Sequence, residues 1–427
     1  MEARDRARAL LTYIDQSPSP FHAVHNAASE LERAGFTRVD ETAPFPRDVR
    51  RGWIERGASL VAWSAGPRPA SDVGFRVLGA HTDSPNLRVK ARPNTGAAGF
   101  RQLGVEVYGG VLLNSWLDRD LSLSGRVIVR RRDRGAEARL FKSDQPLARV
   151  PQLAIHLDRE VNTRGLVLDP QAHLAPVWGL GRADERGLQK FLARELGCDE
   201  GDVLSWDLML HDVVPGTFLG AEQEMLCAPR LDNLCSCHCA LAAVLAHAPD
   251  DAPIAVACLF DHEEVGSTSN RGAQGPLLEY VLERLVLGSG GARDEFHRAI
   301  ARSLCASIDM AHATHPNYRD KHEPDHWIAL GAGPVIKINT NMRYATDAEG
   351  EAVFQLACER AGVPVQKYFH RSNLACGTTI GPLTAARLGL RTVDVGCAQL
   401  SMHSIREMCA ASDPEMMVRA LGAFLAR

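Results

Sequence analysis

An apolar run that ends in a cluster of charged residues constrains this chain more than any other feature. Residues 254–260 form a continuous apolar segment with β-branched members, which predicts a buried strand, and Asp261-His262-Glu263-Glu264 follows it directly. Adjacent glutamates at a strand end repel each other and lose hydration, and this is tolerated where a cation lies between them or one of them holds a proton. The pattern predicts metal-assisted hydrolysis, with one carboxylate on the metal and its neighbour as general base.

Histidine and aspartate residues at the ends of other apolar runs are candidates for the remaining ligands. His81 ends the strand-like segment 75–80, and Asp83 lies two residues further on, so both side chains point to one side of an extended segment. A carboxylate bonded to the second ring nitrogen of a metal-bound histidine fixes its tautomer and raises its basicity. The spacing therefore predicts His81 as a ligand and Asp83 as the group that orients it.

Three further residues hold comparable positions in the chain. Asp232 precedes the helix-favouring stretch 235–247, Asp309 ends the apolar run 304–308, and His403 follows residues 393–400 and a turn. Taken singly, an aspartate before a helix is more often an N-cap, and a lone histidine is more often structural. Together these residues fall where an α/β sheet gathers its site, at the carboxyl ends of its strands. Two histidines with three carboxylates suit a pair of zinc ions that share one aspartate.

The motifs that contain these candidates closely resemble the M18 metallo-aminopeptidases, the aspartyl aminopeptidase family. The strings that carry the resemblance are His81-Thr82-Asp83-Ser84-Pro85, Pro229-Arg230-Leu231-Asp232-Asn233, Asp261-His262-Glu263-Glu264-Val265-Gly266, Ile308-Asp309-Met310-Ala311-His312 and Met402-His403-Ser404-Ile405-Arg406-Glu407. The similarity runs from the first helices to the last motif, so it is not confined to the candidate site.

The resemblance implies a role for each matching residue. Asp232 would bridge two zinc ions. His81 and Asp309 would complete one zinc site, and Glu264 and His403 would complete the other. Glu263 would be the general base, and Asp83 would orient His81. Manganese or cobalt could substitute for zinc. His156 would come from a neighbouring subunit to hold the substrate carbonyl, while Lys337 and Tyr344 would line the substrate pocket. A cation in that pocket suits peptides with N-terminal Asp or Glu.

The distribution of patterns along the chain predicts one catalytic domain interrupted by an insertion. Helix-like segments at 4–16 and 21–35 precede the strand that ends at His81, and helix–strand alternation resumes after Asp232. Residues 87–226 have more β patterns, such as those at 105–108, 126–130 and 166–168. We expect a mixed sheet sandwiched by helices, formed by residues 1–86 and 227–427, with 87–226 as a β-rich dimerisation domain. The family implies dimers that assemble into a tetrahedral dodecamer.

Composition agrees with a soluble enzyme, which we expect in the cytoplasm. The 427 residues are 45% hydrophobic, and a net charge of −4 argues against general affinity for nucleic acid. No apolar stretch approaches the roughly 20 residues needed to cross a bilayer, and the N-terminus does not read as a signal peptide. An odd number of cysteines, eleven, indicates a reducing compartment. Cys235, Cys237 and Cys239 lie in an Ala/Leu-rich segment and are interpreted as compact packing residues.

The sequence is also compatible with other functions. One is an aminopeptidase with a neutral or apolar N-terminal preference, and another is a co-catalytic carboxypeptidase or deacylase that anchors a substrate carboxylate through an arginine such as Arg343. A non-catalytic binding protein is disfavoured because all the ligand candidates and the base are present. A His-Glu-x-x-His zinc helix is excluded because Gly266 occupies the position of its second histidine.

Overall fold

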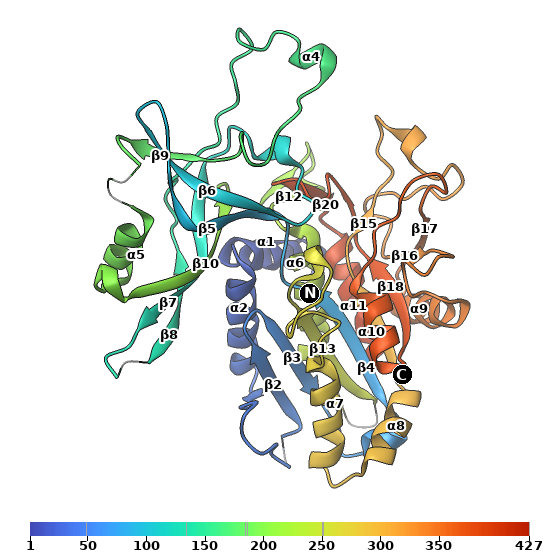
Figure 1. Ribbon diagram of the computed structural model, residues 1–427. Helices are drawn as coiled ribbons and strands as arrows, with labels where there is room; N and C mark the ends of the chain where they lie inside the picture. Colours follow the sequence, from blue (N-terminus) through green and yellow to red (C-terminus); the bar gives the residue numbers. More distant parts are fainter. Residues whose placement is uncertain (48, 134, 184, 186, 250–251, 427) are drawn as a thin grey trace. The chain divides into compact units, whose positions relative to one another are not determined.

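The computed structural model describes residues 1–427 except 48, 134, 184, 186, 250–251 and 427. The chain divides into two compact units (Figure 1). Unit 1 contains Met1–Asp83, Gly216–Met402 and Glu407–Arg427, and unit 2 contains Ser84–Pro215 and His403–Arg406.

A mixed, nine-stranded sheet forms the centre of unit 1 (Figure 1). In spatial order its strands are β1 (Thr37–Arg38), β2 (Arg51–Arg56), β3 (Ser59–Ser64), β13 (Ile254–Phe260), β4 (Phe75–His81), β14 (Leu304–Ile308), β18 (Arg391–Gly396), β16 (Val335–Ile338) and β17 (Gln366–Phe369). Strands β13, β4, β14 and β18 are mutually parallel, so their carboxyl ends lie at the same edge of the sheet. The predicted strands at 254–260, 75–80 and 304–308 are confirmed.

Helices cover both faces of this sheet. On β13, Ala255, Ala257 and Leu259 pack into one core, whereas Val256 and Cys258 pack into the other, as the two-residue period of a strand requires. The first core includes α1 (Ala3–Gln16), α2 (Pro20–Arg33), α6 (Leu231–Leu245), α9 (Ala348–Ala361) and α11 (Asp413–Leu425). The second includes α3 (Ala70–Val73), α7 (Leu277–Gly288), α8 (Arg293–Ala301) and α10 (Ile380–Leu388).

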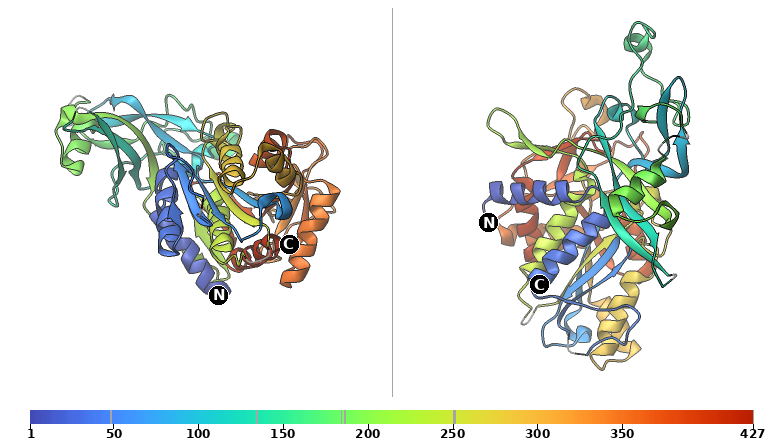
Figure 2. Two further views of the ribbon diagram at one scale, coloured as in Figure 1. Left: turned by 90° about the horizontal axis from the view of Figure 1, so that it is seen from below. Right: turned by 90° about the vertical axis from the view of Figure 1, so that its left-hand side faces the viewer.

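The two ends of the sequence meet within unit 1. Helices α1 and α11 pack side by side (Figure 2), and Arg6 Nε donates to Glu415 Oε2 at 2.9 Å. The helices predicted at 4–16 and 21–35 correspond to α1 and α2, and α2 ends shortly before Gly35, which has a positive φ of 80°. Among the described residues, no helix is both long and apolar enough to cross a membrane.

A smaller, five-stranded sheet also belongs to unit 1. It consists of β11 (Thr217–Leu219), β12 (Met225–Ala228), β20 (Glu407–Ala410), β19 (Ala398–Leu400) and β15 (Ala311–His312). Residues 216–226, which the sequence patterns grouped with the insertion, fall in unit 1 because β11 and β12 pair in succession with β20. The apolar run 393–400 is divided between β18 and β19, since the chain passes from one sheet to the other after Gly396.

Unit 2 is built around a six-stranded antiparallel sheet. Its strands, in spatial order, are β8 (Ala136–Lys142), β7 (Leu121–Arg130), β10 (Val203–Asp212), β5 (Asn86–Thr95), β6 (Phe100–Tyr108) and β9 (Val177–Leu180), with helices α4 (Val161–Arg164) and α5 (Leu188–Leu196). The predicted strands at 105–108 and 126–130 lie within β6 and β7. The strand predicted at 166–168 is wrong, because these residues pair with no neighbouring strand and Val167 is exposed.

Candidate metal centre

His81 is the last residue of β4, at the edge where the parallel strands of unit 1 end. It lies in register with Phe260 of β13, and the next residue, Thr82, donates its backbone N–H to the Phe260 carbonyl at 2.8 Å. The imidazole is buried, with an exposed fraction of 1%. The pairing of β4 and β13 therefore places His81 beside the end of β13, from which the chain continues to Glu263 and Glu264.

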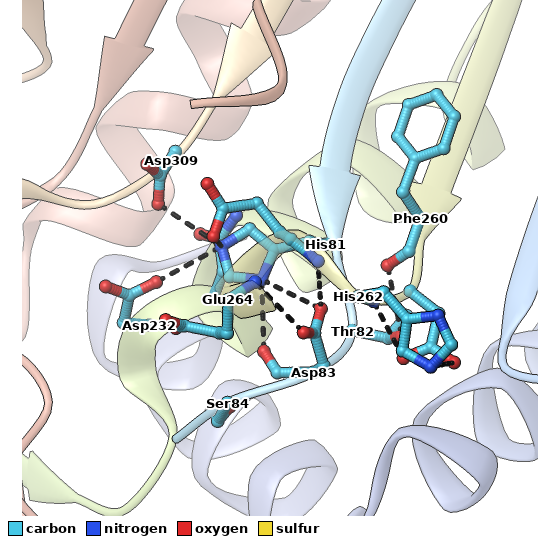
Figure 3. A network of polar contacts seen from close by, with 12 residues as sticks. His81, Thr82, Asp83, Ser84, Asp232, Phe260, His262, Glu264 and Asp309 are labelled. Atoms are coloured by element: carbon cyan, nitrogen blue, oxygen red, sulfur yellow. Dashed lines mark hydrogen bonds and ion pairs between the residues drawn. The ribbon is translucent and has the colours of Figure 1, made fainter. Parts of the chain in front are cut away.

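The two ring nitrogens of His81 have different surroundings (Figure 3). Nδ1 lies 3.0 Å from the main-chain carbonyl of Asp83 and 3.5 Å from its Oδ1. A carbonyl oxygen can only accept, so Nδ1 carries the hydrogen and Nε2 holds the lone pair of the neutral ring. Nε2 lies 3.4 Å from Asp232 Oδ1 and 3.5 Å from Asp309 Oδ1. The ring is thus oriented with its ligand atom towards two carboxylates.

The Asp83 carboxylate fixes the turn that carries the two glutamates. It accepts the backbone N–H of Glu263 at Oδ1 and that of Glu264 at Oδ2, both at 3.1 Å. The turn, η3 (Glu263–Val265), follows His262, whose φ of 66° is left-handed. Asp83 is fully buried, so these contacts satisfy a carboxylate that would otherwise be costly to desolvate. The residue therefore supports His81 mainly through its carbonyl and Glu263 through its side chain.

Asp232 lies at the start of α6. Asp232 and Asn233 have non-helical backbone angles, and the peptide bond between them is cis. The Asp232 N–H donates to Glu407 Oε2, and Asn233 Nδ2 donates to the Ile308 carbonyl, each at 2.9 Å. These bonds connect the Asp232 turn to β20 and to the end of β14. Glu407 and Asn233 stand in the quoted motifs, but their spacing gave no sign of these contacts.

Asp309 follows β14 and is held by a buried lysine. Lys337 Nζ donates to Asp309 Oδ2 at 3.1 Å and to the Met310 carbonyl at 3.3 Å. The ammonium also lies 5.2 Å from the centre of the Tyr344 ring, a cation–π distance. Burial tends to raise the pKa of Asp309, but the neighbouring Lys337 and His81 hold it well below its usual range. Asp309 is therefore an ionised carboxylate, and Lys337 contacts a candidate ligand directly.

The pKa values of Glu263 and Glu264 are raised, whereas that of Asp309 is lowered. Burial, reinforced by Asp309 and other carboxylates, raises the pKa of Glu263 to about 8, and burial with Asp232 nearby raises the pKa of Glu264 well above its usual value. Burial would lower the pKa of His81, yet the surrounding carboxylates raise it well above its usual value. In the metal-free protein the cluster therefore retains protons, as expected of a site whose negative charge is meant for a cation.

The spacing of the donor atoms fits zinc. One atom from each of His81, Asp232 and Asp309 lies within 4.8 Å of the others, and the same holds for His81, Glu263 and Glu264. Ligands of one tetrahedral zinc ion lie about 3.3 Å apart, because each is about 2.0–2.1 Å from the metal. The distances of 3.4 Å and 3.5 Å from His81 Nε2 to Asp232 and Asp309 match that spacing. Imidazole nitrogen with carboxylate oxygens is also a donor set that zinc accepts.

Two predicted site residues belong to unit 2. His403 lies in the segment His403–Arg406, and its Nδ1 is 2.9 Å from the Gly110 carbonyl, which again leaves Nε2 as the lone-pair nitrogen. His156 is exposed in a segment without regular secondary structure. The roles of both residues stay predictions.

Comparison with known proteins gives the family. A family model described as aminopeptidase I zinc metalloprotease (M18) matches residues 13–425, so the chain belongs to the M18 family of zinc aminopeptidases. A probable M18 family aminopeptidase 2 from Streptomyces coelicolor is 51% identical over 420 residues, 97% of this chain and 96% of the relative. The resemblance seen in the sequence is confirmed.

Solved structures share the fold. A chain in the structure of the Ape4 and Nbr1 complex is 35% identical, with a TM-score of 0.94 over 99% of this chain and 86% of that chain. The S. cerevisiae mApe1 dodecamer is 27% identical, with a TM-score of 0.85 over 99% of this chain and 96% of that chain. The predicted mixed α/β class is confirmed.

The raised pKa values predict how pH affects the metal-free protein. Between the ordinary glutamate pKa and about 8, folded Glu263 holds a proton that the unfolded chain has released, so stability falls as pH rises. His81, whose pKa is also raised, contributes stability that is likewise lost at higher pH. We expect the thermal midpoint measured in chelator to be lower at pH 8 than at about pH 5.5, and Glu263→Gln to reduce the difference. A midpoint that rises over this range would contradict the shifts.

Proposed function

We propose that the protein hydrolyses N-terminal residues from peptides, preferring Asp or Glu, through a co-catalytic pair of zinc ions with Glu263 as general base. The observation that carries this proposal is the placement of His81 Nε2 within 3.5 Å of both Asp232 and Asp309, beside the Glu263–Glu264 turn. Manganese or cobalt could replace zinc, since the donor set contains no thiolate.

Asp232 is the residue best suited to bind both ions. Its side chain offers two oxygens, and its backbone is fixed by Glu407. In this proposal His81 and Asp309 complete one site, and Glu264 and His403 complete the other. Bound zinc ions would polarise the scissile carbonyl and lower the pKa of a water molecule, the chemistry of a two-metal hydrolase.

Glu263 is placed to move protons. Its Oε2 lies 3.9 Å from His81 Nε2, close to the ligand atoms, while its backbone is held by Asp83. The side chain is 13% exposed, so it reaches solvent where a substrate would enter. A carboxylate in this position can accept the proton of the attacking water and return it to the leaving amine, and bound cations would favour its ionised form. Glu264, the neighbouring carboxylate, is half-buried with its Oε1 shielded from solvent, and it suits a ligand instead.

The preference for acidic N-terminal residues rests on Lys337 and Tyr344. Both side chains are buried within unit 1. Of its three N–H donors, the Lys337 ammonium uses one to bind Asp309 and one to bind the Met310 carbonyl. One donor remains for a substrate carboxylate. We propose that this donor, with the adjacent Tyr344 ring, selects Asp or Glu over neutral residues.

We further propose that the protein works in the cytoplasm as a homo-oligomer, with unit 2 as its dimerisation domain and dimers assembled into a tetrahedral dodecamer. The S. cerevisiae mApe1 structure is a dodecamer. Within unit 2, Leu153, Leu157 and Val167 are exposed apolar residues that a subunit contact would cover. In this arrangement His156 would reach the site of a neighbouring subunit and hold the substrate carbonyl.

The general-base role predicts a specific loss of turnover. Glu263→Gln removes the proton acceptor but keeps the size of the side chain, so we expect kcat to fall by about 10²–10⁴-fold. Zinc content, measured by elemental analysis, is expected to stay nearly unchanged. Glu32→Gln, at an exposed position on α2, is the matched control and should retain full activity. Unchanged turnover in Glu263→Gln would end the assignment.

The proposed specificity can be tested with matched peptides that carry Asp, Glu, Leu or Lys at a free or acetylated N-terminus. We expect release of Asp and Glu to dominate, and acetylation or chelation to abolish it. In Lys337→Met the ratio of Asp to Leu cleavage should fall by about tenfold or more, because a charged hydrogen bond is lost. Zinc content must be measured beside it, since Lys337 also contacts Asp309. Faster cleavage of Leu by the unchanged protein would refute the selector role.

A further inference from the structure

Asp394 is a fully buried carboxylate on an inner strand of the nine-stranded sheet. It lies on β18, directly opposite Lys337 of the antiparallel neighbour β16. A carboxylate in this position is costly unless every oxygen has a partner. None of the roles proposed above uses Asp394, so its surroundings require a separate explanation.

The two oxygens of Asp394 bind two different loops. Thr379 donates its hydroxyl to Oδ1 at 2.5 Å, and Ala345 donates its backbone N–H to Oδ2 at 2.6 Å. Ala345 lies in the loop 339–347, which follows β16, and Thr379 lies in the loop 370–379, which follows β17. Because β16 and β17 are parallel, both loops leave the sheet at the same edge.

Direct contacts also join the two loops to each other. Arg343 Nε donates to the Cys376 carbonyl at 3.1 Å, and Thr378 donates its hydroxyl to the Arg343 carbonyl at 3.0 Å. Tyr344, between Arg343 and Ala345, is the residue whose ring lies over the Lys337 ammonium. The Asp394 carboxylate therefore anchors the backbone on one side of Tyr344, while the contacts to the second loop anchor the other side.

A glycine at position 381 allows helix α10 to approach the Asp394 carboxylate closely. A Cβ atom at Gly381, in the first turn of α10, would overlap the Asp394 carboxylate, so only glycine allows the helix to approach so closely. Thr379 is the N-cap of the same helix and also accepts the Gly381 N–H at 3.2 Å. The carboxylate thus lies beside the N-terminus of α10, which favours negative charge.

We propose that Asp394 is a positioning residue for substrate binding, which acts by holding the loops 339–347 and 370–379 so that Tyr344 stays beside Lys337. The expected effect on kinetics rests on the proposed peptidase function. The anchoring of the two loops can be tested without measuring peptidase activity. Asp394 itself contacts neither the substrate nor the candidate ligands in this scheme.

The kinetic test compares three substitutions in the zinc-loaded, full-length protein. Asp394→Asn keeps the shape but replaces one of the two acceptor oxygens, each of which receives a hydrogen bond from a different loop, with an amide donor. Thr379→Val removes only the hydroxyl. We expect each to raise KM for the preferred acidic peptide by about tenfold or more, with kcat changed by less than about threefold, because a hydrogen bond to a charged group is lost. Thr379→Ser keeps the hydroxyl and should behave like the unchanged protein. A fall in kcat at constant KM, or equal effects of Val and Ser at position 379, would overturn the proposal.

Amide hydrogen exchange provides a second readout that does not depend on activity. In Asp394→Asn and Thr379→Val, peptides covering 339–347 and 370–379 are expected to exchange faster, while β4 and β13 exchange as before. Unchanged protection of both loops would refute the anchoring. Faster exchange throughout unit 1 would also refute it, because Asp394 would then support the fold generally.

If the unchanged protein cleaves no peptide, the proposed function fails while the exchange result still decides the loop anchoring. If Asp394→Asn does not fold, Thr379→Val and Thr379→Ser carry the comparison.

Discussion

The concentration of buried carboxylates around one imidazole is the constraint on which the site depends. The His81 imidazole is surrounded by the carboxylates of Asp83, Asp232, Asp309, Glu263 and Glu264. Like charges in a desolvated space are unfavourable without a cation. Lys337 offsets part of this charge at Asp309. The remainder is balanced by retained protons in the metal-free protein and, in our proposal, by two zinc ions. Zinc is thus expected to stabilise the fold as well as to supply chemistry.

The sheet tolerates this crowding because main-chain contacts hold each carboxylate in place. Asp83 binds the amides of the glutamate turn, and Glu407 binds the amide of Asp232. Asn233 connects the Asp232 turn to the carbonyl of Ile308, immediately before Asp309. Each candidate ligand in unit 1 is therefore tied to a neighbouring strand or turn, which limits the movement that ionic repulsion would otherwise cause.

Local patterns in the sequence placed the ligand candidates at strand ends, but they gave no sign of the contacts that support these residues. Apolar runs mark where strands end, so His81, Glu263 and Asp309 could be recognised from local pattern, and the parallel register then brought them together. The pairing of Lys337 with Asp309 joins strands that are not adjacent, and spacing carries no information about such a contact. The apolar run 393–400 gave no sign that the chain changes sheets after Gly396, because such a change leaves no mark in hydropathy. The triplet 166–168 is apolar, but it lacks a strand to pair with.

X-ray diffraction from crystals of the zinc-loaded protein, recorded above and below the zinc absorption edge, tests the central claim most directly. Two zinc centres sharing one carboxylate should give two anomalous peaks about 3.5–4 Å apart, with Asp232 between them. His81 and Asp309 should contact one peak, and Glu264 and His403 the other. A single peak, or zinc bound away from the ends of β4, β13 and β14, would contradict the co-catalytic centre.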